Sequence, residues 1–263
     1  MTTLPILRWQ LRDGIRGLIA WSLALIAVLC VYLPIYPSIH SPALTEMVDS
    51  LPQQMSGFFG MDSIATGAGY TQATFFGLLG YVLAAIACIS WGSKAIAGAE
   101  DSGRLEMILT HAVGRGRYAL ESLLTLTVRV VVLCVIAATA ILILNGPSDL
   151  GLAPSHIVIT TCVWGMLALT LGITALSVGA MTERPSWAIG AGAALTVVSY
   201  IFDAITRTTT NLNWLSYFSP YHWAYGDSPL RTGNAWGGIG LLAGLCAVLF
   251  ALGYAAFTRR DVC

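Results

Sequence analysis

The sequence predicts an all-α, polytopic membrane protein with six transmembrane helices and with both termini in the cytoplasm. Of its 263 residues, 56% are hydrophobic and only 10% are charged, whereas soluble globular domains carry about 25% charged residues. The charged residues are bunched, and six uncharged windows separate them. Each window can hold the roughly 20 apolar residues that cross a bilayer as a helix. The lysines and arginines also concentrate on one side of the predicted membrane.

Each uncharged window gives one expected span within a single transmembrane domain, residues 1–263. The first window is not read as a cleaved signal peptide, because a long polar start precedes it and no small-residue cleavage site follows a short apolar region. Pro34 and Pro37 are expected to end or kink the first span, since proline lacks a backbone donor. The spans are expected at 18–38, 71–93, 120–144, 157–180, 187–205 and 236–256.

The distribution of lysine and arginine predicts the orientation, because positively charged loops stay on the cytoplasmic side. A cytoplasmic N-terminus leaves only Arg207 and Arg231 outside, with Arg129 inside the third span. The opposite orientation would reverse this bias. The residues then expected in the cytoplasm are Arg8, Arg12, Arg16, Lys94, Arg104, Arg115, Arg117, Arg184, Arg259 and Arg260.

Residues 1–17 show the pattern of an amphipathic helix that lies along the inner leaflet. Apolar residues, beginning with Leu4 and Leu7, recur at spacings of three and four, and arginines occupy another side. These arginines serve either as anchors for the first span or as contacts for a partner.

The longest cytoplasmic connection, 94–119, is expected to form a short amphipathic helix capped by Ser102. Leu105 and Leu109 share one face of this helix with Ile108, and Arg104 and Glu106 point elsewhere. Such a helix either pushes on a soluble partner or lies on the membrane surface.

The two longer external connections differ in character. Residues 39–70 contain a short amphipathic stretch compatible with a small re-entrant or lid-like helix. Residues 206–235 are rich in aromatic side chains, which suits an interfacial belt, an external re-entrant region or a hydrophobic exit gate. The aromatic residues that could form the gate are Tyr217, Phe218, Tyr221 and Trp223.

Three features in the spans or at their ends have specific expectations. Arg129 is either a substrate contact or a side chain that reaches back to the inner interface. Asp203 and Arg207, four residues apart, are expected to pair. Glycines at positions 165, 172 and 179 are expected to allow close helix packing.

Several kinds of chemistry lack their sequence signals. The chain has no Gly-x-x-x-x-Gly-Lys-Ser/Thr loop for nucleotide phosphates, no His-Glu-x-x-His pair and no Gly-x-Ser-x-Gly elbow. No Cys/His cluster has metal-ligand spacing, so no metal site is expected. The net charge is zero, which gives no basic patch for nucleic acid. We therefore expect a chain that is not an enzyme and binds no cofactor itself.

Three stretches together resemble the ABC-2 type permease family, the membrane subunits of ATP-binding cassette exporters with a type V exporter-like fold. Residues 100–109, Glu-Asp-Ser-Gly-Arg-Leu-Glu-Met-Ile-Leu, are similar to the family's cytoplasmic segment, although Ala112 and Gly114 stand where its following turn has Pro and Ser. Ser219-Pro220-Tyr221 is similar to its external Ser-Pro-aromatic motif, and residues 257–262 are similar to its Phe-x-Arg-Arg-Asp ending.

The resemblance runs from end to end of the chain and implies a mechanism. Two permease subunits, identical or different, would form the pathway for an amphipathic or hydrophobic cargo such as a drug, antibiotic or lipid-like molecule. Two separate ATPase subunits would bind ATP and Mg²⁺ beneath them, in a plasma membrane that is expected to be a bacterial inner membrane. The residues expected to contact the ATPase are Glu100, Arg104, Leu105, Glu106, Leu109 and Arg115, and those expected along the pathway are Arg129, Tyr217, Phe218, Tyr221 and Trp223.

Two other functions remain open from the sequence. A secondary transporter could be built from two inverted three-span halves, but the halves show no similarity and few acidic residues lie at mid-membrane. A structural membrane subunit of a larger complex is the other alternative.

Overall fold

The computed structural model describes residues 4–39, 66–109, 114–208 and 210–259, and these form helices without a β-strand. Six helical segments within them are long and apolar enough to cross a membrane: Ile15–Ser38, Gly67–Ala95, Arg115–Asn145, Pro154–Thr182, Pro185–Thr208 and Trp236–Arg259. The predicted all-α, six-span fold class is therefore confirmed.

The elements are α1 (Pro5–Asp13), α2 (Ile15–Tyr32), η1 (Leu33–Ile35), α3 (Tyr36–Ile39), α7 (Gly67–Thr71), η2 (Gln72–Leu79), α8 (Gly80–Ala95), α9 (Ala97–Asp101), α10 (Arg104–Leu109), α11 (Arg115–Asn145), α12 (Pro154–Thr182), α13 (Pro185–Thr208), η3 (Thr210–Phe218), α14 (Pro220–Tyr225), α15 (Pro229–Thr232) and α16 (Trp236–Arg259).

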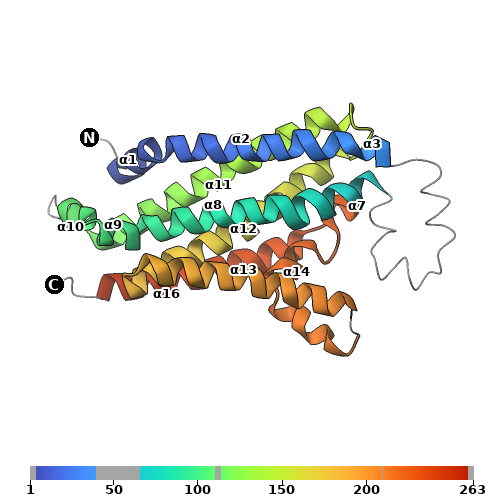
Figure 1. Cartoon of the computed structure of the whole chain (residues 1–263). Helices are drawn as coiled ribbons and strands as arrows, with labels where there is room; N and C mark the ends of the chain where they lie inside the picture. The colour runs from blue at the N-terminus through green and yellow to red at the C-terminus, as the bar shows by residue number, and fades with distance from the viewer. Residues whose placement is uncertain (1–3, 40–65, 110–113, 209, 260–263) are drawn as a thin grey trace.

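The spans form an elongated bundle with two distinct ends (Figure 1). One end, called the terminal end below, carries α1, α9, α10 and the last turn of α16. The opposite end, called the loop end, carries α3, α7 and α14. An even number of spans returns the chain to its starting side, so α1 and the end of α16 lie at the same end of the bundle.

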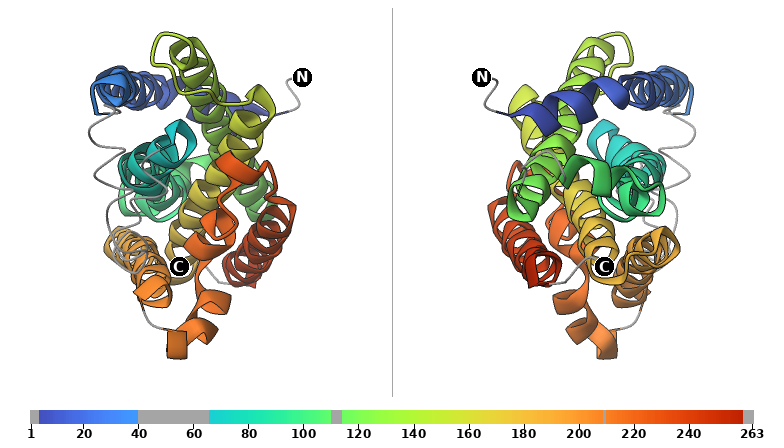
Figure 2. Two further views of the ribbon diagram at one scale, coloured as in Figure 1. Left: turned by 90° about the vertical axis from the view of Figure 1, so that its right-hand side faces the viewer. Right: turned by 90° about the vertical axis from the view of Figure 1, so that its left-hand side faces the viewer.

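Helix α12 lies at the centre of the bundle and contacts α8, α11, α13 and α16. Most residues of its apolar stretch are buried, whereas few residues are buried in the spans that contain α2, α13 and α16. The end-on views in Figure 2 show these three helices on the outside of the bundle. Their exposed residues, such as Leu23, Val197 and Leu252, are apolar, as is required where helices face lipid.

Small residues let the central helices approach closely, as the sequence predicts. A Cβ atom on Gly92 of α8 would overlap the carbonyl oxygen of Gly172 in α12, so these two backbones are in direct contact. Gly165 instead faces Cys134 of α11, and Gly179 faces Ala97 and Ala188. The three glycines of α12 therefore serve contacts with several neighbours and do not line one seam.

Two spans depart from regular α-helix near the loop end. The prolines of the first span do not end it, because the chain tightens into the 3₁₀ turn η1 and continues as α3. The second span starts with α7 and then widens into a π-helical stretch, η2, before it becomes α8. Sequence periodicity gave no sign of this stretch. The lid-like helix expected within residues 39–70 falls mainly in 40–65, outside the described residues.

Exposed tryptophans mark both ends of the bundle. Trp9 of α1 and Trp187 of α13 lie at the terminal end, and Trp214 and Trp236 lie at the loop end. Tryptophan is enriched at the two membrane interfaces, where its ring is apolar and its N–H remains hydrated. These positions fit a bundle that spans the bilayer along its long axis.

Candidate functional site

A helical hairpin, α9 and α10, projects from the terminal end (Figure 1). Gly103 joins the two helices with φ +67°, a conformation that costs glycine little. Its N–H donates to the carbonyl of Glu100 at 2.8 Å. The Ser102 hydroxyl donates to the Gly98 carbonyl at 2.8 Å and accepts from Arg104 Nε at 2.9 Å. The sequence predicted Ser102 as a cap for the second helix, and the structure uses its hydroxyl to close α9.

Leu105 fixes the hairpin to the bundle. Its side chain is 1% exposed and belongs to a buried apolar cluster, called the hairpin cluster below, whose residues come from α1, α9, α10, α11, α12, α16 and the α8–α9 junction. Because all these elements meet beneath α10, a displacement of the hairpin would be transmitted to several spans at once. The buried members are Ile6, Ile96, Ala99, Leu105, Tyr118, Ala119, Leu176, Ala180 and Phe257.

The other residues predicted to contact an ATPase lie around this anchor. Arg104 and Glu106 are exposed on α10, next to the exposed Met107. Glu100 is half-buried in α9, and Arg115 begins α11. The side chain of Leu109 lies outside the described residues. The predicted amphipathic pattern is thus observed for Leu105 and its polar neighbours, and Leu105 faces inward.

A buried carboxylate that the sequence analysis did not single out holds α1 on the bundle. Glu121 of α11 is 2% exposed, and its Oε2 accepts the backbone N–H groups of Ile6 and Leu7, each at 2.9 Å. Arg117, one turn earlier, donates from Nε to Glu121 Oε1 at 2.8 Å. These N–H groups belong to the first turn of α1. The N–H groups of a first turn have no hydrogen-bond partner within their own helix, and the positive end of the helix dipole there favours a carboxylate. The i,i+4 spacing of Arg117 and Glu121 was the available sequence signal.

Arg129 lies at the terminal end, in a cavity of about 250 Å³ lined by α1, α2, α8, α9, α10 and α11. Its Nη2 donates to the carbonyl of Gln10 at 2.5 Å, and its guanidinium lies 5.4 Å from the centre of the Trp91 ring. The long side chain of Arg129 therefore reaches toward the terminal end of the span. This agrees with the second hypothesis for it, a side chain that reaches back to the interface. Lys94 and Arg104 also line this cavity.

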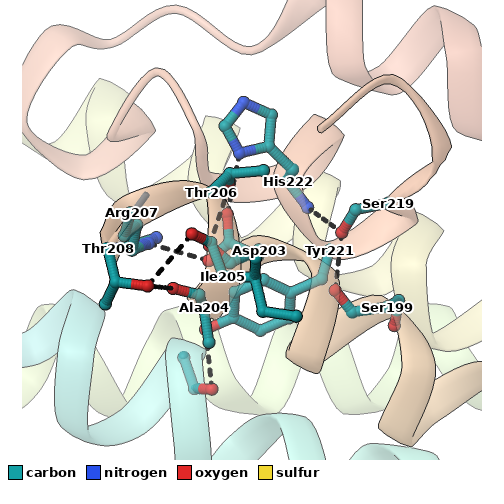
Figure 3. Close-up of polar contacts among 11 residues, drawn as sticks. Ser199, Asp203, Ala204, Ile205, Thr206, Arg207, Thr208, Ser219, Tyr221 and His222 are labelled. Carbon is teal, nitrogen blue, oxygen red and sulfur yellow. Dashed lines mark hydrogen bonds and ion pairs between the residues drawn. The ribbon is translucent and has the colours of Figure 1, made fainter. Parts of the chain in front are cut away.

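A second polar cluster lies at the loop end (Figure 3). Asp203 of α13 is 2% exposed. Its Oδ2 accepts from Arg207 Nε at 2.8 Å, which confirms the predicted pair, and its Oδ1 lies 2.7 Å from His222 Nδ1. The Ser219 hydroxyl donates to the Ser199 carbonyl at 2.6 Å and accepts the His222 N–H at 3.0 Å. These bonds tie α14 to α13.

The Ser-Pro-Tyr sequence at 219–221 has a clear structural role. Ser219 caps α14 and Pro220 occupies its first turn, where a missing N–H costs nothing. Tyr221 then enters the core, and its hydroxyl donates to the carbonyl of Gly77, in the π-helical stretch, at 2.8 Å. Burial raises the pKa of Tyr221 and that of Tyr225. Both side chains therefore remain neutral phenols.

The five residues predicted along the pathway are not gathered at one place. Tyr217 and Phe218 lie exposed on η3, and the half-buried Trp223 donates from Nε1 to the Tyr217 carbonyl at 3.2 Å. Tyr221 is buried beneath them, whereas Arg129 lies near the opposite end. The aromatic residues thus form a loop-end group of their own. Among the described residues, no three His, Cys, Asp or Glu side chains are placed to hold a metal ion.

The family model described as ABC-2 family transporter protein matches residues 4–262, almost the whole chain. A search of curated proteins found no match.

Proposed function

Because this chain belongs to the ABC-2 family of transporter proteins and is a multi-pass membrane permease subunit, we propose that it serves an ATP-driven exporter. In this proposal it pairs with a second permease subunit, identical or different, to form the pathway for an amphipathic or hydrophobic cargo. Two ATPase subunits drive it and bind the ATP and Mg²⁺. The membrane is a plasma membrane, that of a bacterial cell, with the terminal end in the cytoplasm.

The α9–α10 hairpin and its anchor are the observation that carries this proposal. The hairpin presents Arg104, Glu106 and Met107 outward, and Leu105 connects it to the hairpin cluster. A soluble ATPase that pushes on the outer face would thereby displace α11, α12 and α16 together. Distributed coupling of this kind is what a subunit without its own phosphate-binding loop requires.

The charge distribution supports the orientation. The terminal end carries Arg8, Arg12, Arg16 and Lys94, among other basic residues, whereas the loop end carries Arg207 and Arg231. Basic residues favour the cytoplasmic side. The exposed aromatic residues Tyr217 and Phe218 then lie on the outer side, where they suit an exit gate for an apolar cargo.

The proposal is tested by charge reversal on the exposed face of the hairpin. The tagged chain is purified in mild detergent from its native host, bound proteins are identified, and ATPase activity is measured. We expect a stoichiometric ATP-binding cassette protein with wild-type chain and a large loss of it with Glu106→Lys. Asp227→Lys is the matched control, because Asp227 is an exposed acid at the loop end.

The alternatives give different results. A chain that moves cargo in liposomes without any ATPase would be a secondary transporter and would overturn the proposal. A chain that binds the ATPase but supports no transport until another permease is added would be one half of a heteromeric pathway, or a structural subunit if cargo contacts map only to the other half.

A further inference from the structure

The cavity around Arg129 has features of a ligand site that neither the proposed transport pathway nor the helix packing explains. Its lining includes Trp9, Gln10 and Asp13 of α1, the helix that crosses the terminal end of the bundle in Figure 2. Its volume of about 250 Å³ is below the roughly 300–1,000 Å³ of pockets for drug-sized ligands. A small polar group fits this space better than a whole cargo molecule.

The lining of the cavity is strongly biased in charge. Lys94, Arg104 and Arg129 contribute three positive charges, and Asp13 is the one acidic residue in the described lining. Asp13 lies 4.0 Å from Arg104, with both side chains largely exposed, so this pair is weak. The described lining therefore carries more basic than acidic side chains.

Arg129 has hydrogen-bonding capacity left over. One of its donors is used by the neutral carbonyl of Gln10, and its face is covered by Trp91. Its buried Nε has no hydrogen-bond partner among the described residues. A buried donor without a partner is unfavourable, and guanidinium groups bind phosphate oxygens with two parallel bonds.

The position of the cavity indicates where the anion comes from. Trp9 lines it from α1, the interfacial helix, and Gly14 and Gly17 line it where α1 passes into the first span. This is the depth of lipid headgroups if the bundle spans the bilayer as described. Basic pockets between spans on the cytoplasmic side bind anionic headgroups.

We propose that this cavity binds the phosphate group of an anionic phospholipid, with Arg129 as the principal contact and Lys94 and Arg104 at the rim. The bound headgroup would connect α1, the hairpin and α11. The site is separate from the loop-end aromatic group, and the proposal depends neither on the cargo nor on the direction of transport.

Lipid binding to the purified full chain tests this directly. Native mass spectrometry counts bound lipid during titration with phosphatidylglycerol, with phosphatidylcholine and, in a third arm, with inorganic phosphate. We expect tight binding of phosphatidylglycerol alone, weakened about tenfold by Arg129→Gln, as the loss of one charge-assisted bond predicts. Lys94→Gln, at the exposed rim, provides a second variant should Arg129→Gln fail to fold.

The matched control is Arg12→Gln, which removes an exposed charge from α1 outside the cavity. It should leave phosphatidylglycerol binding unchanged. Equal losses with Arg12→Gln and Lys94→Gln would mean general surface attraction and would overturn the site. Equal binding of phosphatidylcholine, or displacement of the lipid by inorganic phosphate at similar concentration, would overturn the assignment to an anionic lipid.

Discussion

The carboxylate of Glu121 accepts the backbone N–H of Ile6 at 2.9 Å across 115 residues of sequence. A buried acid of one span thus takes the place of the side-chain cap that α1 lacks at its own N-terminus. The amphipathic helix that the sequence predicts for residues 1–17 is therefore attached to α11.

Replacing Glu121 with alanine is expected to release α1. The N–H groups of Ile6 and Leu7 would lose a charged acceptor, a change that costs about 1.5–3 kcal/mol. Hydrogen exchange should show faster exchange in residues 5–13 and little change in α12. Glu106→Ala is the control, because Glu106 is exposed on α10. Unchanged protection of α1 in the Glu121 variant would show that lipid or apolar contacts alone hold this helix.

Adding a methyl group at the crossing of α8 and α12 is expected to destabilise the bundle. The new Cβ of Gly92→Ala would overlap the Gly172 carbonyl, and overpacking of this kind costs about 1–3 kcal/mol. The midpoint of thermal unfolding in detergent should fall. Gly244→Ala, in α16, meets nothing within 4 Å and should be neutral or stabilising. Similar effects of both substitutions would argue against the close contact.

The ion pair with Asp203 predicts that loss of Arg207 destabilises the fold more than loss of another exposed arginine at the loop end. Arg207→Ala leaves the buried Asp203 carboxylate with His222 and without its guanidinium partner, which should cost about 1–3 kcal/mol. Arg231→Ala, also exposed and at the loop end, should cost little. Unfolding in detergent measures both. Equal stability of the two variants would mean that His222 alone satisfies Asp203.

The sequence predicted those features that depend on composition and local spacing. Six spans follow from six uncharged windows, and the Asp203–Arg207 pair follows from an i,i+4 spacing on one helix. The apolar Leu105 between the charged Arg104 and Glu106 predicted which of these three side chains of α10 would lie in apolar surroundings. This pattern did not show that Leu105 shares one buried cluster with Phe257 and Ile6, because that cluster joins distant parts of the chain.

The same limit explains what the sequence missed at each end. Glu121 was not singled out from the sequence, since its partners, the backbone N–H groups of Ile6 and Leu7, lie on another helix. The π-helical stretch has no distinct residue pattern, although the bond from Tyr221 to Gly77 depends on it. The cavity around Arg129 requires the meeting of six helices, which no local sequence signal indicates.

In the α9–α10 hairpin, substitutions can distinguish residues that stabilise the fold from residues that contact the ATPase. Leu105→Ala should destabilise the isolated chain by about 2–5 kcal/mol, because it opens a cavity in a buried cluster. Leu105→Met, which conserves volume, should cost less than about 1.5 kcal/mol. Glu106→Lys should leave the unfolding midpoint unchanged and still lose the ATPase, because Glu106 is exposed. If Leu105→Ala lost the ATPase without any loss of stability, Leu105 would be a direct contact that turns outward in the complex.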